Sequence, residues 1–110
     1  MIRTAALGTK AIMRAASANN VKRVVITSSL LAIKGKLDKT QVRFTAQDWT
    51  DPQIEDAHYQ IKTMAEKAAW DFEDKSIEVV SINPGLIVGP NINGGRFSSG
   101  DFVKRLMMGE

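Results

Sequence analysis

Tyr59 and Lys62 stand three residues apart at the start of a segment with helical spacing, and His58 lies four residues before Lys62. An ammonium group one helical turn from a phenol favours the phenolate, so a tyrosine placed there can act as a general acid or base near neutral pH. An imidazole exchanges protons in the same range. The segment therefore indicates proton-transfer chemistry, with two solvated side chains on a helix surface as the alternative.

Polar residues also follow each of two apolar runs that have the pattern of strands. The first run ends in TSS at residues 27–29, and the second ends in NPG at residues 83–85. In an open α/β sheet, ligands bind beyond the carboxyl ends of the strands, and the ends of parallel strands open onto one edge. Ser29 is therefore a candidate catalytic hydroxyl. The alternative is that it only closes a strand by bonding the local backbone.

The elements that would position these residues follow from the hydrophobic pattern. Residues 4–19 carry small and apolar side chains at helical spacing, and the pair Asn19-Asn20 is a suitable stop. The continuous β-branched run at 24–26 indicates a strand covered on both faces, which is typical of a parallel sheet. A second short strand is centred on 79–82.

Between the strands we expect a long binding loop over residues 30–56, followed by a helix from about Asp56 to Lys75. A Gly-rich loop and a last helix should come after the second strand, with Ser98 and Asp101 at capping-box spacing. The apolar face of the longer helix is formed by residues at helical spacing, Ile61, Ala65, Ala68 and Phe72.

A strand, a helical crossover and a second strand make a βαβ unit, whose crossover is right-handed in nearly all proteins. Two parallel strands alone cannot cover their own faces and edges. The sequence therefore predicts an α/β fold, in the form of a slice from a larger doubly wound parallel sheet.

Composition places the chain among globular proteins, since 44% of its 110 residues are hydrophobic and 25% are charged. It has no Cys and one His, so a disulfide framework, a thiolate nucleophile and a Cys-based zinc site are excluded and no metal is expected. No apolar run is long enough for a membrane span, and no secretory signal pattern is present. We expect a cytoplasmic protein.

The net charge of +3 is unevenly distributed, because residues 1–45 carry nine Lys or Arg against the single acid Asp38. A nucleic-acid surface and an N-terminal transit peptide are the interpretations that such a segment allows. However, the basic residues are scattered without interleaved aromatics, and the first segment runs directly into a strand. We therefore expect a solvated surface and no nucleic-acid partner.

Five stretches, GTKAIMRAASANNVKRVVITSS, AQDWTDP, KTMAEKAAWDFEDK, INPGLIVGP and SSGDFVKRLMMGE, closely resemble extended short-chain dehydrogenase/reductases. Within that family they are most similar to the branch of dihydroflavonol reductases, cinnamoyl-CoA reductases and 3β-hydroxysteroid dehydrogenases. The resemblance implies a Rossmann-type fold and hydride transfer between NADP or NAD, with NADP preferred, and a small-molecule carbonyl or secondary alcohol. It also implies that residues 1–90 belong to the cofactor-binding domain and that residues 91–110 begin the substrate-binding region.

The resemblance assigns site residues position by position. Ser29 matches the family's Ser that hydrogen-bonds the substrate carbonyl or hydroxyl. Lys62 matches the Lys that holds the nicotinamide ribose and assists the catalytic Tyr. The cofactor-binding residues implied are Thr27, Ser28, Lys62, Pro84, Gly85 and Leu86.

The catalytic Tyr is where this sequence departs from the family. The family pattern is Tyr-x-x-x-Lys, but His58 stands four residues before Lys62 and Tyr59 only three before it. On a regular helix, Tyr59 would point about 100° away from the family position. A local change of winding at the helix start would make Tyr59 the proton donor, which is our first choice. Otherwise His58 serves, or the site has lost its activity.

A glycine motif for a dinucleotide pyrophosphate is missing, because the eight Gly form neither G-x-x-G-x-x-G nor G-x-G-x-x-G. The family carries that motif upstream of its fourth helix, within which Met1 is expected to lie, so the chain corresponds to the middle of a larger enzyme. Two functions follow: the catalytic segment of an NAD(P)-dependent oxidoreductase, or a non-catalytic fragment or pseudoenzyme with a structural or interaction role. The expected protein partner is another copy of the chain, in an oligomer, or the remainder of the parent chain.

Overall fold

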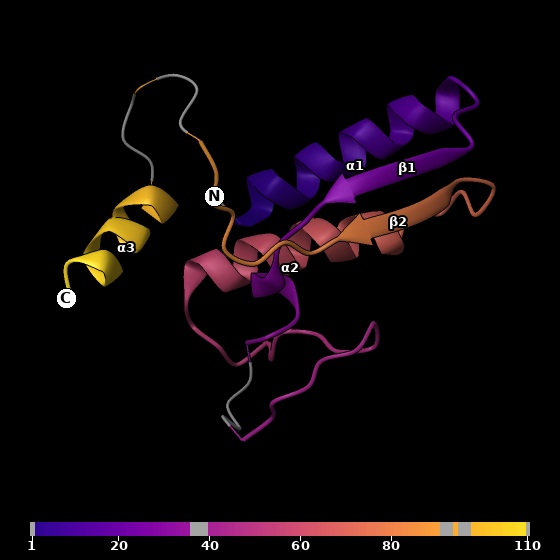
Figure 1. The fold of residues 1–110 in the computed structure, drawn as a ribbon. Helices are drawn as coiled ribbons and strands as arrows, with labels where there is room; N and C mark the ends of the chain where they lie inside the picture. The colour runs from indigo at the N-terminus through magenta and orange to yellow at the C-terminus, as the bar shows by residue number, and fades with distance from the viewer. Residues whose placement is uncertain (1, 36–39, 91–93, 95–97, 110) are drawn as a thin grey trace.

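The computed structural model describes residues 2–35, 40–90, 94 and 98–109. Two parallel strands form a small sheet, two helices pack together on one of its faces, and a third helix follows the second strand after a loop (Figure 1). In chain order the elements are α1 (Ile2–Ala18), β1 (Arg23–Thr27), the 3-10 turn η1 (Leu30–Ala32), α2 (Ala57–Trp70), β2 (Glu78–Ile82) and α3 (Ser98–Met107).

Helix α1 ends at the predicted pair of Asn residues. Asn20 has a φ of 55°, the left-handed conformation that commonly closes helices. Its backbone N–H donates to the carbonyl of Ser17 at 3.0 Å, and the N–H of Val21 donates to the carbonyl of Ala16 at 3.0 Å. These are the two bonds of a Schellman motif, and they direct the chain from α1 into β1.

The sheet confirms the predicted α/β class and the βαβ arrangement, since β1 and β2 pair in parallel with Val25 opposite Val80. Val24 and Ile26 pack on the helices, whereas Val25 is 56% exposed. The prediction that both faces of this strand are covered is therefore wrong for the described residues. The reason is that α1 and α2 both pack on the same face of the sheet.

The core lies where α1 and α2 meet over this face. Met13 of α1 is 1% exposed and contacts a cluster that includes Ala69, Phe72 and Ile77. The small Ala69 allows the helices to approach closely, and burial of a Met side chain contributes about 1.5–3 kcal/mol. This cluster fixes α2, and with it the candidate site, relative to the sheet.

Helix α2 ends at Trp70, earlier than the predicted end at Lys75. Asp74 explains the difference, because its Oδ1 accepts a bond from the backbone N–H of Ser76 at 3.0 Å. This side chain-to-backbone bond forms a turn that competes with the helix and leads into β2. Phe72 lies beyond the helix but is buried, so its predicted place in the core is confirmed.

The expected long loop over residues 30–56 opens with η1 and later returns to it. The buried Thr50 makes this closure, because its backbone N–H donates to the carbonyl of Ala32 at 2.8 Å and its Oγ1 donates to the carbonyl of Leu31 at 2.6 Å. The two ends of the loop are thus held together beside α2.

The last helix, α3, lies in the segment where a last helix was predicted; it begins at Ser98 and has Asp101 in its first turn. The Gly-rich loop expected before it lies outside the described residues, apart from Gly94.

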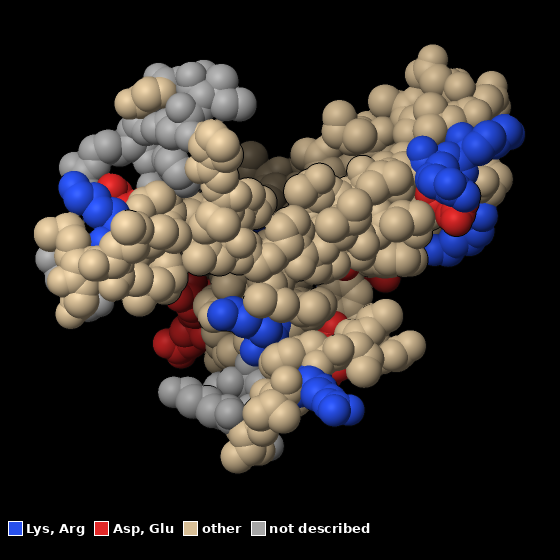
Figure 2. Space-filling view, viewed as in Figure 1, with Lys and Arg blue, Asp and Glu red and all other residues tan. Residues whose placement is uncertain are grey.

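Within the described ranges, no helix is long and apolar enough to cross a membrane. The same residues contain no group of three His, Cys, Asp or Glu side chains that could hold a metal ion. On the face shown in Figure 2, the basic side chains lie in small separate groups rather than in one stripe.

Candidate active site

The chain segments that follow β1 and β2 continue side by side beyond the last paired residues of the two strands. The backbone N–H of Ser28 donates to the carbonyl of Ile82 at 2.8 Å, and that of Leu30 donates to the carbonyl of Pro84 at 2.8 Å. The TSS and NPG segments therefore meet at one edge of the sheet, as their positions after parallel strands predicted.

Ser29 lies at this edge and caps η1. Its Oγ accepts a bond from the backbone N–H of Leu31 at 3.2 Å, so the hydroxyl does bond the local backbone. Within the described part of the chain, the hydroxyl proton of Ser29 has no acceptor. Ser29 can therefore cap the turn and still donate a hydrogen bond to an oxygen atom of a ligand.

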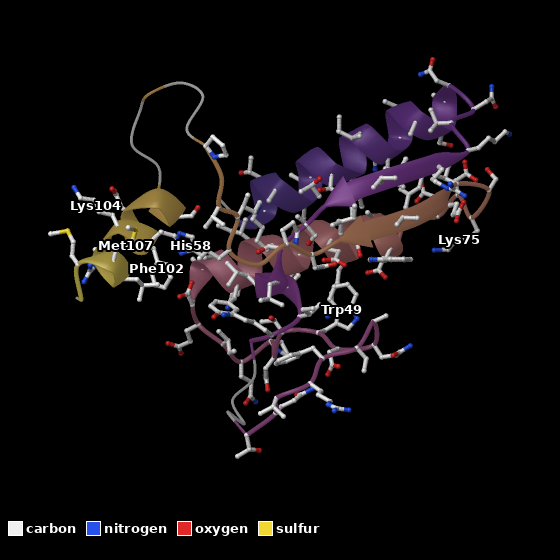
Figure 3. All side chains as sticks on the ribbon, viewed as in Figure 1. Trp49, His58, Lys75, Phe102, Lys104 and Met107 are labelled. Carbon is white, nitrogen blue, oxygen red and sulfur yellow. The ribbon has the colours of Figure 1, made fainter. Side chains whose placement is uncertain are left out.

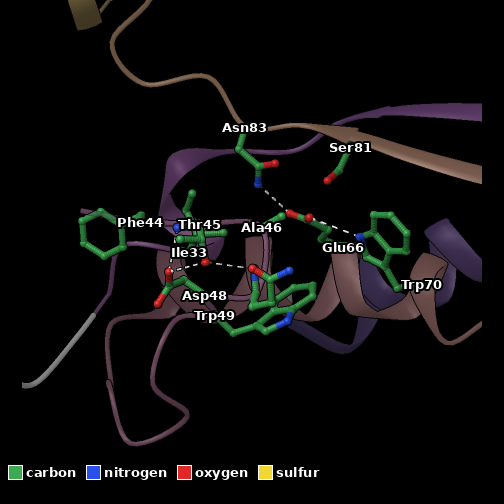
Figure 4. Close-up of a pocket in the computed structure, with 11 residues that line it drawn as sticks. Ile33, Phe44, Thr45, Ala46, Asp48, Trp49, Glu66, Trp70, Ser81 and Asn83 are labelled. Carbon is green, nitrogen blue, oxygen red and sulfur yellow. Dashed lines mark hydrogen bonds between the residues drawn. The ribbon is translucent and has the colours of Figure 1, made fainter. Parts of the chain in front are cut away.

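The carboxylate of Glu66 joins the two strand ends to α2. Figure 4 shows its bonds to Asn83 and Trp70. Glu66 is 4% exposed; its Oε2 accepts bonds from the hydroxyl of Ser28 and from Nδ2 of Asn83 (2.7 Å), and its Oε1 accepts one from the indole of Trp70 (3.3 Å). We refer to these four residues as the Glu66 junction. Ser28, a predicted cofactor-binding residue, thus donates its hydroxyl proton inside the fold.

Sequence reasoning missed Glu66. The one signal that pointed to it was indirect: a hydroxyl at one strand end and an amide at the other, Ser28 and Asn83, need an acceptor once the strands bring them inside the fold.

Helix α2 has regular α-helical winding from its start at Ala57. Asp56 caps the helix, because its Oδ1 accepts a bond from the backbone N–H of His58 at 2.8 Å. The N–H of Gln60 donates to the carbonyl of Asp56 at 3.2 Å, which is the i to i−4 bond of an α-helix. The change of winding that would turn Tyr59 toward the family position is not present at this helix start.

The half-buried ring of Tyr59 packs against Gly35 and Thr50. A Cβ atom added at Gly35 would lie 2.7 Å from Cδ1 of Tyr59 and 2.7 Å from Cγ2 of Thr50. The Oγ1 of Thr50 also accepts a bond from the N–H of Gly35 at 3.0 Å. Position 35 therefore requires glycine because of a close approach.

His58 and Lys62 lie one turn apart, and both side chains are exposed (Figure 3 labels His58). Nδ1 of His58 is 3.4 Å from Oδ1 of the capping Asp56. Within the described ranges, the ammonium of Lys62 has no hydrogen-bond or ion-pair partner. Because η1 packs against α2 and Gly35, which follows η1, approaches the ring of Tyr59, this helix start and the turn capped by Ser29 belong to the same region of the fold.

Of the other predicted cofactor-binding residues, Pro84 is half-buried, whereas Thr27, Gly85 and Leu86 are exposed at the sheet edge. With the ammonium of Lys62 and the hydroxyl proton of Ser29, they offer hydrogen-bond donors that suit ribose hydroxyls and a carboxamide oxygen.

A cavity of about 670 Å³ opens beside the Glu66 junction (Figure 4). The loop over this cavity is held on α2 by Lys67, whose Nζ lies 5.0 Å from the ring centroid of Trp49, a cation–π geometry. The cavity is lined by residues 44–49 of the loop together with Ile33, Glu66, Trp70, Ser81 and Asn83.

Comparison with known proteins assigns the family. A model described as the NAD dependent epimerase/dehydratase family matches residues 1–108. The chain belongs to this family. Its reductase branch, predicted from the sequence motifs, is also confirmed: the chain is 37% identical over 98 residues to cinnamoyl-CoA reductase 1 of Petunia hybrida, an alignment that covers 82% of this chain and 29% of that protein.

Two further relatives are reductases. Anthocyanidin reductase ((2S)-flavan-3-ol-forming) of Vitis vinifera is 34% identical over 102 residues, covering 84% of this chain and 30% of that protein. Dihydroflavonol 4-reductase of Arabidopsis thaliana is 37% identical over 94 residues, covering 77% of this chain and 24% of that protein. The chain therefore matches less than a third of the length of these family members.

Proposed function

We propose that the protein containing this chain is an NAD(P)-dependent reductase or dehydrogenase that interconverts a small-molecule carbonyl and a secondary alcohol. The chain would supply its catalytic segment. The proposal is supported by Ser29, whose hydroxyl proton has no acceptor among the described residues, because it caps η1 and η1 packs on α2. The start of α2 presents His58 and Lys62 at the family spacing. The reductases among the relatives support the same reaction class.

The bound cofactor would supply the hydride chemistry. Lys62 would hold the nicotinamide ribose through its ammonium, and the exposed backbone at Gly85 and Leu86 would lie against the nicotinamide end. We propose NADP rather than NAD, as the reductase branch implies. Residues 1–90 would then belong to the cofactor-binding domain and residues 91–110 to the substrate-binding region.

His58 is the proton donor in this proposal. It lies four residues before Lys62, and an imidazole exchanges protons near neutral pH. Tyr59, the first choice from the sequence, packs its ring against Gly35, and its position on α2 is rotated by about 100° around the helix axis from that of His58. Ser29 would donate its hydroxyl proton to the substrate oxygen and so orient the substrate.

The proposal is tested with the protein in the length that its source produces. Oxidation of NADPH and of NADH is followed with a panel of aromatic ketones, aldehydes and CoA thioesters, and cofactor binding is measured by calorimetry. We expect turnover with at least one carbonyl, faster with NADPH, and a loss of about 100-fold in Ser29→Ala. Absence of both turnover and cofactor binding would overturn the proposal.

A second candidate is a non-catalytic protein with a structural or interaction role. The substitution of His58 for the family's Tyr, with Tyr59 turned into the fold, favours it. Such a protein would show a cooperative thermal melt but would bind neither cofactor in the calorimetric measurement. For both candidates we propose a cytoplasmic location and no nucleic-acid partner. The protein partner would be a second copy of the chain or the rest of its parent protein.

A further inference from the structure

We infer that Asn83, held by Glu66, fixes the position of Ser29. Asn83 and Glu66 would then be positioning residues for the reaction proposed above, on which their catalytic meaning depends. The contacts that define the link lie entirely within the described chain.

The link starts at the side-chain amide of Asn83. Its Nδ2 donates to Oε2 of Glu66 at 2.7 Å and to the backbone carbonyl of Ser29 at 3.1 Å. A primary amide has two N–H bonds on one nitrogen, so a single side chain can serve both acceptors. Asn83 follows β2 and Ser29 follows β1. This amide therefore connects the two strand ends beyond the last ladder pair, Thr27 and Ile82, and between the backbone bonds made by Ser28 and Leu30.

Glu66 holds the amide in place. Its carboxylate is buried and has no cationic partner among the described residues, and three donors surround it, from Ser28, Asn83 and Trp70. Bonds to a carboxylate are stronger than bonds between neutral groups, and an acceptor shared by three donors has few alternative orientations. Loss of the carboxylate would leave the amide of Asn83 without its anchor.

The backbone of Ser29 is the part of the site that this link restrains. Its carbonyl accepts a bond from Asn83 across the strand ends and a second from the N–H of Ala32 within η1 at 2.9 Å. Its Oγ simultaneously caps the turn at Leu31. A shift of about 1 Å in a reacting group can lower the rate by up to about 100-fold. Loss of the hydrogen bond from Asn83 is therefore expected to lower the rate of a reaction in which Ser29 takes part.

Two variants separate an effect on the position of Ser29 from an effect on stability: Asn83→Asp alone, and a double variant in which the carboxylate and the amide exchange places between positions 66 and 83. In Asn83→Asp, two carboxylates face each other and the carbonyl of Ser29 loses its donor. In the double variant Glu66→Gln/Asn83→Asp, the amide at position 66 can donate to the carboxylate at position 83. This restores the contact between positions 66 and 83, but it does not restore the bond to Ser29.

The variants are compared, in the protein at its natural length, by melting temperature, by kcat and KM, and by the NMR amide resonances of Ser29 and Leu31. We expect Asn83→Asp to lower both Tm and kcat, with kcat falling about 100-fold. The double variant should recover most of the Tm, while kcat stays at least about tenfold low, KM for NADPH is unchanged and both resonances remain displaced. Glu73→Gln, an exposed acid just after α2, serves as the matched control and should change none of these quantities.

Recovery of kcat together with Tm in the double variant would overturn the inference. So would a wild-type position of the Ser29 and Leu31 resonances in Asn83→Asp. If the unmodified protein does not turn over any carbonyl, the proposed function fails, and the NMR comparison alone decides whether Asn83 positions Ser29.

Discussion

Helix α2 contributes polar side chains both to the Glu66 junction and to its own exposed start, but the hydrogen-bonding groups at the two places are used in opposite ways. Glu66 is buried and bonded to three donors of the protein, and no described side chain has a buried nitrogen or oxygen atom without a partner. Lys62, one turn away, is exposed and has no partner in the part of the chain that the structure describes. Buried polar groups must be satisfied internally, whereas exposed ones remain available to a ligand. One stretch of α2 therefore maintains geometry, and the other is equipped to bind.

The largest effect should come from Lys62→Ala, which removes the open cation. We expect turnover to fall by about 100- to 1,000-fold, because the group that holds the cofactor ribose and assists proton transfer is lost. The melting temperature should change by less than about 3 °C, since the side chain is exposed. Steady-state kinetics and calorimetry measure the two effects.

Lys10→Ala on the exposed side of α1 is the matched control and should alter neither quantity. Full activity in Lys62→Ala, with or without a loss of stability, would show that the exposed ammonium of Lys62 is only a surface charge.

The second prediction compares His58→Ala with Tyr59→Phe. The exposed imidazole should be the more important group, with a loss of about 100-fold in kcat for His58→Ala and less than about threefold for Tyr59→Phe. The reverse order would assign proton transfer to Tyr59 and would place the packed ring, rather than the exposed side of the helix, at the reacting atoms. If both variants keep the kcat of the wild-type protein, the mapping of the helix start onto the family motif is wrong.

Gly35→Ala should have a smaller effect, and on stability. The added methyl group would meet Tyr59 and Thr50 at 2.7 Å, so we expect a loss of about 1–3 kcal/mol in the free energy of unfolding by urea. Gly8→Ala is the opposite case, because nothing lies within 4 Å of its added Cβ in α1, and we expect a gain of about 0.5–1 kcal/mol. An equally stable Gly35→Ala variant would mean that the ring of Tyr59 is free to move.

The smallest expected effect concerns Asp74, a half-buried acid that accepts hydrogen bonds from the protein. The hydroxyl of Ser17 donates to its Oδ2 at 2.6 Å, and this bond, with those from Ser76, lowers the pKa of Asp74 below its ordinary value of 3.8. A carboxyl whose pKa is lower in the folded state stabilises the fold above the unfolded pKa, and this contribution is lost as the pH falls through the folded pKa. Asp74→Asn should therefore weaken the acid dependence of Tm below about pH 4.

Melting curves across the acid range test this prediction, with Glu73→Gln as the control that should keep the wild-type profile. An unchanged acid dependence in Asp74→Asn would show that the bond from Ser17 to Asp74 does not persist in solution.

The βαβ fold was predictable because its signals are local. The β-branched run at 24–26, the run at 79–82 and the helical pattern between them each specify one element, and the crossover rule joins them. The end of α2 was missed because a single side chain, Asp74, bonds the backbone N–H of Ser76 in competition with the helix. The exposure of Val25 depends on which elements cover the sheet, and no pattern within β1 contains that information.

The candidate site was predictable in part. Its location at the strand ends followed from topology, but the Glu66 junction did not, because a Glu becomes a buried acceptor only after Ser28 and Asn83 have been brought together. The orientation of Tyr59 depends on contacts with Gly35 and Thr50, which are remote in sequence. Such long-range contacts leave no periodic trace in the chain.

The cavity beside the Glu66 junction has an optical consequence. The chain contains two tryptophans, and both Trp49 and Trp70 line this cavity. One indole lies under the ammonium of Lys67, and the other donates to the carboxylate of Glu66. The tryptophan fluorescence of the chain therefore originates beside the strand ends, so that a molecule entering the cavity would change the emission without any added label.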